Sequence, residues 1–305
     1  IIGCGSSYNA AMLGKYYFES ISKIPTSIYR PSEFTFFNQN LKKVLYIFIS
    51  QSGETADTCD LLESNKEFFK DSLSIVNNID SRLVKNTKDS INLSLGIEKG
   101  VAATKTFTGQ ITILHLMSFC FTEGSKVTIP KLDSDYKTFF NVEEEVKRIA
   151  EKFYKAKNFF ILGRNFTYPV ALEAALKIKE ISYIHSEGSL SSEMKHGPIA
   201  LLDNNFPILY LLSNDKSTVL KEIMNLYEAH TRSKKIILFA TTDSIELIDP
   251  EFLSQIEFIS IPEKTPSVLP LYFTLLAQLL SYHLAKLNNL SIDQPRNLAK
   301  VVTVA

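Results

Sequence analysis

The sequence has little glycine, with 11 residues of this type in a chain of 305. An average chain contains about 7% glycine, so we expect these few to mark turns that other residues cannot adopt. Cysteine is scarce as well, because Cys4, Cys59 and Cys120 are scattered and form no Cys-x-x-Cys pair. This excludes a disulfide framework and a readable zinc site, and it makes a reducing cytoplasm the expected location.

Neither sign of charge is in excess, since 33 Lys and Arg residues balance 33 Asp and Glu residues. This balance argues against a nucleic-acid or membrane-surface partner, although a local patch could still hold one phosphate. The most apolar stretch, 268–285, is interrupted by Pro270, Gln278 and His283, which predicts a buried helix and not a membrane span. No signal peptide is visible, and the start at Ile1 instead of Met indicates a piece of a longer protein.

Four continuous apolar runs are present, the kind that a parallel sheet buries on both faces. They are Val44–Ile49, Asn158–Leu162, Pro207–Leu212 and Lys235–Ala240. Helical patterns lie between them, which predicts an α/β fold with parallel sheets. Residues 1–8 and 161–168 are similar and each precedes a helical pattern. We therefore expect two similar units, residues 1–145 and 146–305, with the charged segment 142–157 at the boundary.

The turn Ser50-Gln51-Ser52-Gly53-Glu54-Thr55 follows the 44–49 strand and precedes a helix expected from Ala56. Such a turn presents free N–H groups and the positive end of the helix dipole. With three hydroxyls and an amide, it predicts a cradle for a phosphate. The alternative is ordinary helix N-capping, which needs only one hydroxyl. The turn 3–7 is also expected between a strand and a helix. Its small residues either contact a sugar phosphate or only allow close packing.

Glu173, Lys177 and Glu180 lie at i, i+4 and i+7 on one helix face. They form either a surface ladder of ion pairs or, if buried, a general base tuned by a lysine. His196 stands beside Gly197 and Pro198 in a polar stretch, and it is either a catalytic loop residue or an exposed structural one.

The tail, 293–305, is irregular and then apolar. It is expected to dock and to bring Arg296 and Lys300 with it. A lysine in a partly apolar pocket can lose its proton and attack a carbonyl. The alternative is a plain C-terminal strand whose cations face solvent.

Together these segments resemble the isomerase half of the glutamine–fructose-6-phosphate aminotransferases, which is built of two sugar-isomerase (SIS) domains. The resemblance covers the whole chain and is most specific in ALKIKEISYIHSE (175–187), MKHGP (194–198) and DQPRNLAK (293–300). It implies two tandem SIS domains, each a doubly wound, mainly parallel sheet flanked by helices, and a catalytic C-terminal tail. It also implies fructose 6-phosphate as substrate, glucosamine 6-phosphate as product, and neither a metal nor an organic cofactor.

The resemblance further assigns roles to individual residues. Lys300 would form a Schiff base with the sugar carbonyl, His196 of a neighbouring subunit would assist ring opening, and Glu180 would move a proton from C1 to C2 with Lys177 beside it. A homodimer follows from the role of His196. The substrate-binding set implied is Ser7, Ser50, Gln51, Ser52, Thr55, Val101, Ala103, Glu173 and Ala299.

The chain departs from the family pattern at three positions. Ala103 and Val301 stand where the family usually has serine, and Ala305 stands where it usually has a terminal glutamate. We expect weaker substrate contacts or an altered end, and not a lost reaction. No glutaminase nucleophile is expected here, because Cys4 lies in a strand-to-helix turn. Ammonia would come from glutamine through a glutaminase domain that is not part of this chain.

Two alternatives remain open. One is a glucosamine-6-phosphate deaminase or other sugar-phosphate isomerase of the SIS type. The other is a non-catalytic SIS module that senses a sugar phosphate, which would need the turn 50–55 but not Glu180, His196 and Lys300 together.

Overall fold

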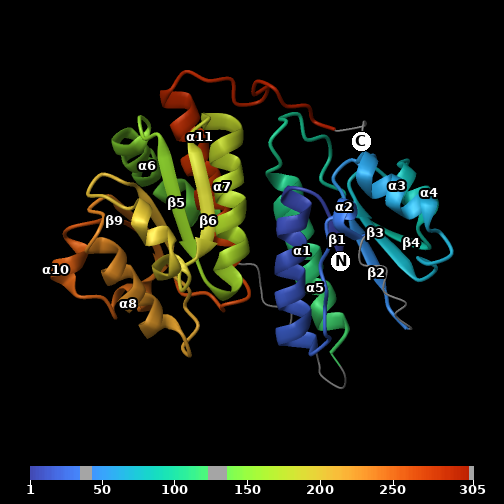
Figure 1. Ribbon diagram of the computed structural model, residues 1–305, viewed down its shortest axis with the longest axis horizontal. Helices are drawn as coiled ribbons and strands as arrows, with labels where there is room; N and C mark the ends of the chain where they lie inside the picture. Colours follow the sequence, from blue (N-terminus) through green and yellow to red (C-terminus); the bar gives the residue numbers. More distant parts are fainter. Residues whose placement is uncertain (35–42, 123–135, 302–305) are drawn as a thin grey trace. The chain divides into compact units, whose positions relative to one another are not determined.

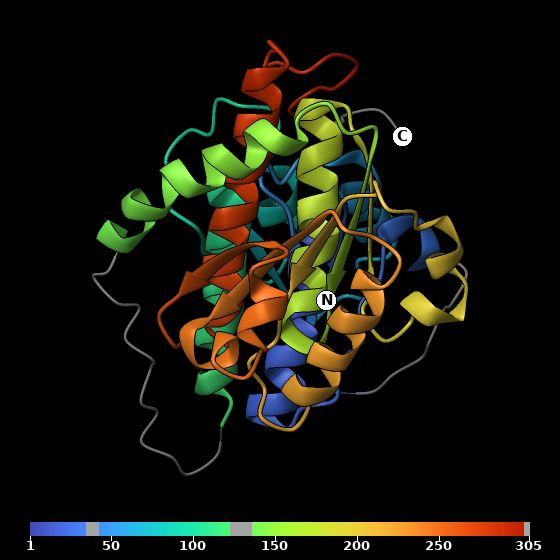
Figure 2. The ribbon, with the colours of Figure 1, turned by 90° about the vertical axis from the view of Figure 1, so that its left-hand side faces the viewer.

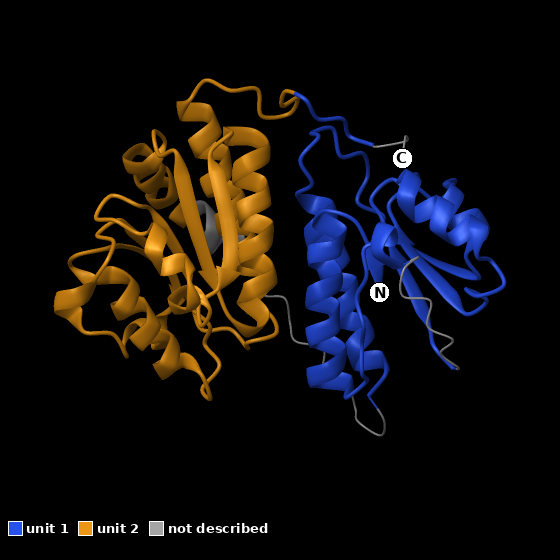
Figure 3. Cartoon of the chain, in the orientation of Figure 1, with its two compact units in different colours: residues 1–129, 297–305 blue, residues 130–296 orange. Residues whose placement is uncertain are grey.

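A computed structural model describes residues 1–34, 43–122 and 136–301, and for 136–141 the backbone alone. The chain forms two compact units, one of residues 1–129 with 297–305 and one of residues 130–296 (Figure 3). This grouping differs from the expected ranges 1–145 and 146–305 in two respects: the second unit begins earlier, and the end of the tail joins the first unit. The domain boundary itself remains a prediction.

The first unit contains a four-stranded, fully parallel sheet of order β1-β2-β3-β4 (Figure 1). Its strands are β1 (Ile2–Gly3), β2 (Tyr46–Ile49), β3 (Ser72–Val76) and β4 (Asp89–Asn92). Its helical segments are α1 (Ser6–Tyr17), η1 (Phe18–Ser22), α2 (Pro31–Phe34), α3 (Ala56–Ser64), α4 (Arg82–Asn86) and α5 (Lys105–Cys120). Figure 1 shows α1 and α5 on one side of this sheet and α3 and α4 on the other.

Aromatic side chains fill one face of the first sheet. Phe34, Tyr46 and Phe48 each contact Phe69 with ring centroids 4.9–5.3 Å apart, within the range of favourable edge and tilted ring pairs. Phe68 packs on Tyr46 and Phe69 from the segment between α3 and β3. This cluster anchors β2 and therefore fixes where the turn that follows β2 begins.

The second unit contains a five-stranded parallel sheet of order β6-β5-β7-β8-β9. Its strands are β5 (Asn158–Gly163), β6 (His185–Leu190), β7 (Ile208–Leu211), β8 (Ile236–Thr241) and β9 (Glu257–Ile261). Its helical segments are α6 (Tyr136–Phe153), η2 (Asn165–Thr167), α7 (Tyr168–Ser182), η3 (Met194–His196), η4 (Pro198–Leu201), α8 (Val219–His230), α9 (Thr242–Ile245), α10 (Pro250–Leu253) and α11 (Leu269–Leu287).

Alternate residues of the central strands in this sheet bury opposite faces. Phe160, Ile208 and Leu238 belong to one core cluster together with residues of α8. Phe159 and Phe239 point to the other face, where they contact Phe153 of α6 and Phe273 of α11. Helices thus cover both faces of the sheet (Figure 2), which explains why its central strands are apolar throughout.

The structure confirms the predicted α/β class with parallel sheets flanked by helices. The four apolar runs contain β2 and β7 and most of β5 and β8, and the stretch 268–285 lies almost entirely in α11. None of the helices among the described residues is long and apolar enough to cross a membrane. Within each unit, the carboxyl ends of the parallel strands meet at one edge of the sheet, where ligands of such folds bind.

Candidate active site

The turn 50–55 connects β2 to α3 at the carboxyl edge of the first sheet. Ser50 is buried and its Oγ accepts a hydrogen bond from Gly53 N–H at 3.0 Å. The Ser50 and Thr55 hydroxyls lie 3.1 Å apart, and Ser52 Oγ accepts from Glu54 N–H at 3.1 Å. Thr55 precedes α3, but its side chain makes no capping hydrogen bond to that helix. The first N–H groups of α3 have no partners within the helix, so the turn presents donors of the kind that bind phosphate.

Gly53 holds this turn in its shape. Its φ is +68°, a left-handed conformation that residues with a side chain rarely adopt, and an added Cβ would lie 2.1 Å from Ser81 Oγ. The Gly53 carbonyl accepts from Leu83 N–H at 3.1 Å, and Glu54 Oε1 accepts from Arg82 N–H at 2.8 Å. Two N–H groups in the first turn of α4 therefore hold the turn 50–55 in place.

The other turn of the first unit, 3–7, leads from β1 into α1 at the same edge. Ser7 is buried, and its Oγ accepts a hydrogen bond from Gln110 Nε2 of α5 at 3.0 Å. Cys4 Sγ lies 3.7 Å from Thr58 Oγ1 of α3. Burial raises the pKa of the Cys4 thiol, so the cysteine favours its neutral form and is a poor nucleophile at neutral pH.

Lys300 belongs to the first unit and forms an ion pair there that no sequence pattern predicts. Its Nζ donates to Glu98 Oε2 at 2.5 Å, across 202 positions of the sequence. Glu98 is 8% exposed and belongs to the loop between β4 and α5. Burial alone would raise the pKa of Glu98, but hydrogen bonds from Lys300, Thr104 and Thr106 outweigh it and lower that pKa. The carboxylate therefore stays ionised beside the lysine.

The remaining first-unit candidates lie on the segments around this ion pair. Val101 and Ala103 are half-buried in the loop after β4, and Ala299 is exposed next to Lys300. Val301 is half-buried, and Ala305 lies outside the described residues. The turns after β1, β2 and β4 all leave the carboxyl edge of one parallel sheet, so Ser7, Ser50–Thr55 and the Glu98 loop share that edge.

In the second unit, Lys177 stands between two carboxylates on α7. Its Nζ lies 3.3 Å from Glu173 Oε1 and 2.5 Å from Glu180 Oε2. Glu173 and Lys177 are 1% and 2% exposed, whereas Glu180 is half-buried. The burial rules out a solvated surface ladder for these three residues. Burial alone would lower the pKa of Lys177, but the attraction of the carboxylates outweighs it and raises that pKa.

Glu180 lies at the opposite end of α7 from the turn that follows β5. Glu180 lies twelve residues beyond Tyr168, and at 1.5 Å per residue this is about 18 Å along the helix. The tail reaches this far end of α7: Arg296 N–H donates to Tyr183 Oη at 2.8 Å, and the Arg296 guanidinium lies 4.2 Å from the Tyr183 ring centre. The expected docking of the tail is thus present at Arg296 and at Lys300.

His196 is exposed at the end of η3, in the segment that follows β6. Gly197 comes next with a φ of +140°, and Met194 is buried and anchors the segment. The backbone at His196 is thereby fixed while its ring faces outward.

The candidate residues therefore fall into two sets. The first unit holds Ser7, Ser50–Thr55 and Lys300, and the second unit holds His196 and the three charged residues of α7.

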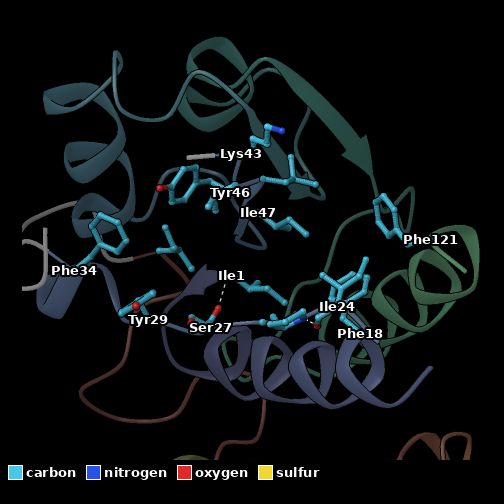
Figure 4. A pocket seen from close by; sticks show the side chains of 15 residues that line it. Ile1, Phe18, Ile24, Ser27, Tyr29, Phe34, Lys43, Tyr46, Ile47 and Phe121 are labelled. Atoms are coloured by element: carbon cyan, nitrogen blue, oxygen red, sulfur yellow. Dashed lines mark hydrogen bonds between the residues drawn. The ribbon is translucent and has the colours of Figure 1, made fainter. Parts of the chain in front are cut away.

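A cavity of about 340 Å³ in the first unit contains none of these candidates (Figure 4). It lies where β1 and β2 begin, and most of its lining is apolar or aromatic, including Phe18, Phe34, Tyr46 and Phe121.

Among the described residues, no group of three or more His, Cys, Asp or Glu side chains could hold a metal ion. The expectation that no metal or cofactor is needed stays a prediction.

The chain is similar to known proteins along its whole length. A family model described as the SIS domain matches residues 1–118 and 152–287. The glutamine–fructose-6-phosphate aminotransferase (isomerizing) of Aquifex aeolicus is 40% identical over 308 residues, which are 100% of this chain and 51% of that protein. The Escherichia coli protein of the same name is 36% identical over 319 residues, with 100% and 51% covered. The chain thus spans about half the length of these curated relatives.

Solved structures show the same relationship. The C-terminal domain of glucosamine-fructose-6-phosphate aminotransferase from Francisella tularensis matches with a TM-score of 0.84 and 34% identity, over 96% of this chain and 85% of that chain. A glucosamine-6-phosphate deaminase from Thermotoga maritima matches with a TM-score of 0.76 at 22% identity, over 99% and 89%. The second likeness is one of fold alone.

Proposed function

The chain belongs to the SIS domain family and corresponds to the isomerase half of the glutamine–fructose-6-phosphate aminotransferases, and from this premise we propose that it isomerises fructose 6-phosphate. In the complete enzyme, a glutaminase domain outside this chain would supply ammonia from glutamine, and the product would be glucosamine 6-phosphate. The observation that carries the proposal is the 40% identity over the whole chain to one half of such an aminotransferase.

The phosphate of the substrate is proposed to bind at the turn 50–55. Ser50, Ser52 and Thr55 supply hydroxyls, Gln51 supplies an amide, and the start of α3 supplies N–H groups and a favourable dipole. The buried Ser7, held by Gln110, contacts the sugar in this proposal, together with Val101, Ala103, Glu173 and Ala299. A phosphate bound at one end positions the reacting carbons at the other, which converts remote binding energy into orientation.

Lys300 is proposed to attack the open-chain ketose carbonyl and form a Schiff base. The imine withdraws electrons from the neighbouring carbon and makes the C1 proton easier to remove. Glu180 would take this proton and return it to C2, so that a ketose becomes an aldose. A carboxylate suits a proton shuttle of this kind, and the half-buried Glu180 beside the cation Lys177 is a fixed base.

His196 is proposed to open the sugar ring from a second copy of the chain, so the working form would be a homodimer. The support is the resemblance together with the exposure of the His196 ring on a backbone that Met194 and Gly197 hold in place. A cytoplasmic location is proposed as well, since Cys4, Cys59 and Cys120 are all free thiols and such thiols are typical of a reducing compartment.

The rival activity, deamination of glucosamine 6-phosphate, has weaker support. The deaminase structure is 22% identical to this chain, against 34% for the aminotransferase domain. The non-catalytic alternative would not require a buried lysine flanked by two carboxylates in addition to a phosphate turn.

The test is an assay of the purified chain with fructose 6-phosphate, in which glucose 6-phosphate is measured through glucose-6-phosphate dehydrogenase. We expect steady formation of glucose 6-phosphate and none of glucose when fructose replaces the phosphorylated sugar. A folded, dimeric chain that binds fructose 6-phosphate and forms no product would contradict the proposal in favour of a sensing module.

A further inference from the structure

Glu98 is a buried carboxylate whose two oxygens have separate partners. Oε1 accepts from Thr104 N–H at 3.0 Å and from Thr106 N–H at 3.2 Å, and these bonds shape the loop that leads into α5. Oε2 accepts from Thr106 Oγ1 at 2.8 Å and from Lys300 Nζ at 2.5 Å. The loop is therefore held mainly by one oxygen, and the tail lysine by the other.

A carboxylate used only to shape a loop would not need a contact with the tail. The Lys300 side chain is 24% exposed, so its ammonium could be solvated instead, yet it lies on the buried oxygen. A charge-assisted hydrogen bond is stronger than a neutral one, so it holds the amine in position and directs one of its protons at the carboxylate. Glu98 Oε2 is the acceptor of the Lys300 ammonium, so this carboxylate is placed to exchange that proton.

We propose that Glu98 is the positioning residue of the reactive lysine, holding the Lys300 amine in place and exchanging the proton that the amine must lose to attack the sugar. This inference rests on the proposed function, because it assumes that Lys300 forms the Schiff base. It adds a residue and a proton path that the assignment of Lys300 alone does not provide.

The proposed step is balanced in atoms and charge. The ammonium of Lys300 gives one proton to Glu98 Oε2, and the freed lone pair forms a C–N bond with the ketose carbonyl. A second proton moves from nitrogen to the former carbonyl oxygen. Glu98 then returns its proton to that hydroxyl, the C–O bond breaks, and water leaves. The product iminium nitrogen keeps one proton and the positive charge that the ammonium had.

The experiment measures the rate at which borohydride traps a fructose 6-phosphate adduct on Lys300, located by mass spectrometry of peptides. The variant is Glu98→Gln, because a glutamine oxygen at the Oε1 position still accepts from Thr104 and Thr106 while its NH₂ group cannot accept from the ammonium. We expect trapping to slow by about 100-fold, the lower range for general acid–base catalysis. Binding of fructose 6-phosphate, measured by calorimetry, should change less than threefold.

The matched control is Thr106→Val, which removes the other hydrogen bond to Oε2 and leaves Lys300 intact. It should slow trapping less than threefold. If Glu98→Gln does not fold, as judged by circular dichroism, Glu98→Asp replaces it, and its shorter acid should slow trapping at least about tenfold with binding retained.

The outcomes separate the two proposals. Equal trapping rates in the parent chain and in Glu98→Gln would overturn the role of Glu98 while leaving the Schiff base in place. Equal slowing by Thr106→Val would also overturn it, because the effect would then belong to the loop. A parent chain that is never trapped on Lys300 would overturn the Schiff-base function itself.

Discussion

The hydroxyl groups of Ser50 and Thr55 lie 3.1 Å apart, at the two ends of the turn between β2 and α3. Ser50 Oγ also accepts from Gly53 N–H, so the turn is closed on itself by its own side chains. Thr55 is the N-cap residue of α3, but its side chain makes no hydrogen bond to the first N–H groups of that helix. A phosphate entering the turn could accept hydrogen bonds from these hydroxyls and from the first N–H groups of the helix.

Gly53→Ala should damage both the turn and substrate binding. The new methyl group would sit 2.1 Å from Ser81 Oγ at a φ of +68°, and the left-handed conformation alone costs about 1–2 kcal/mol. We expect the KM for fructose 6-phosphate to rise at least about tenfold and the unfolding midpoint to fall. Gly96→Ala is the control, because Gly96 has a similar φ of +65° and nothing within 4 Å of an added Cβ. It should lose a similar conformational contribution to stability with an unchanged KM, and equal KM values in the two variants would contradict the account.

Ala103→Ser should improve binding of the substrate. Ala103 is half-buried in the loop after β4, where the resemblance places a serine hydroxyl on the sugar. One added hydrogen bond contributes about 0.5–1.5 kcal/mol, so the KM for fructose 6-phosphate should fall by roughly two- to tenfold. The neighbouring substitution Ala102→Ser serves as control and should leave the KM unchanged. A KM that does not fall in Ala103→Ser would remove Ala103 from the substrate contacts.

Acid should destabilise the first unit through Glu98. The hydrogen bonds from Lys300, Thr104 and Thr106 lower the pKa of this carboxyl in the folded state despite its burial. Its ionised form therefore contributes stability above the ordinary glutamate pKa of about 4.3, and that contribution is lost as pH falls through the lowered pKa. Thermal unfolding midpoints measured from pH 6 to pH 3 should fall more steeply for the parent chain than for Glu98→Gln. Parallel curves would contradict this origin.

Lys177→Met should destabilise the second unit strongly. The substitution removes the cation beside Glu173, which is 1% exposed, and loss of one partner of a buried pair costs about 3–5 kcal/mol. Lys15→Met is the matched control, because the Lys15–Glu19 pair is also an i, i+4 pair but is partly exposed. Such a pair contributes about 0–1 kcal/mol, and urea unfolding should show this contrast. A similar decrease in the free energy of unfolding in both variants would show that the burial of the ion pair on α7 adds no stability.

The fold was predictable from the sequence wherever the pattern of apolar residues along the chain determines the secondary structure. The central strand β8 is apolar from Ile236 to Ala240 because helices cover both faces of the sheet. The helix from Ala56 and the buried helix at 268–285 were predicted for similar reasons. The tail is different: Lys300 pairs with Glu98 of the first unit, and no local pattern indicates a contact across 202 positions.

The site residues show the same limit. Spacing placed Glu173, Lys177 and Glu180 on one helix face, but it could not distinguish a buried cluster from a solvated one, since burial depends on what packs against α7. Glu98 was missed because a single buried carboxylate has no periodicity. Its position three residues before Val101, which belongs to the implied substrate-binding set, was the one available signal.

The most direct test of the account compares isomerisation by the parent chain, Glu180→Gln and Glu173→Gln. Fructose 6-phosphate is the substrate, and calorimetry measures its binding alongside glucose 6-phosphate formation. The account predicts that Glu180→Gln lowers kcat by about 100-fold or more, as expected for loss of a general base, with binding retained and Lys300 still trapped by borohydride. Glu173→Gln should lower kcat far less. An unchanged kcat in Glu180→Gln with intact binding would contradict the proposed proton transfer.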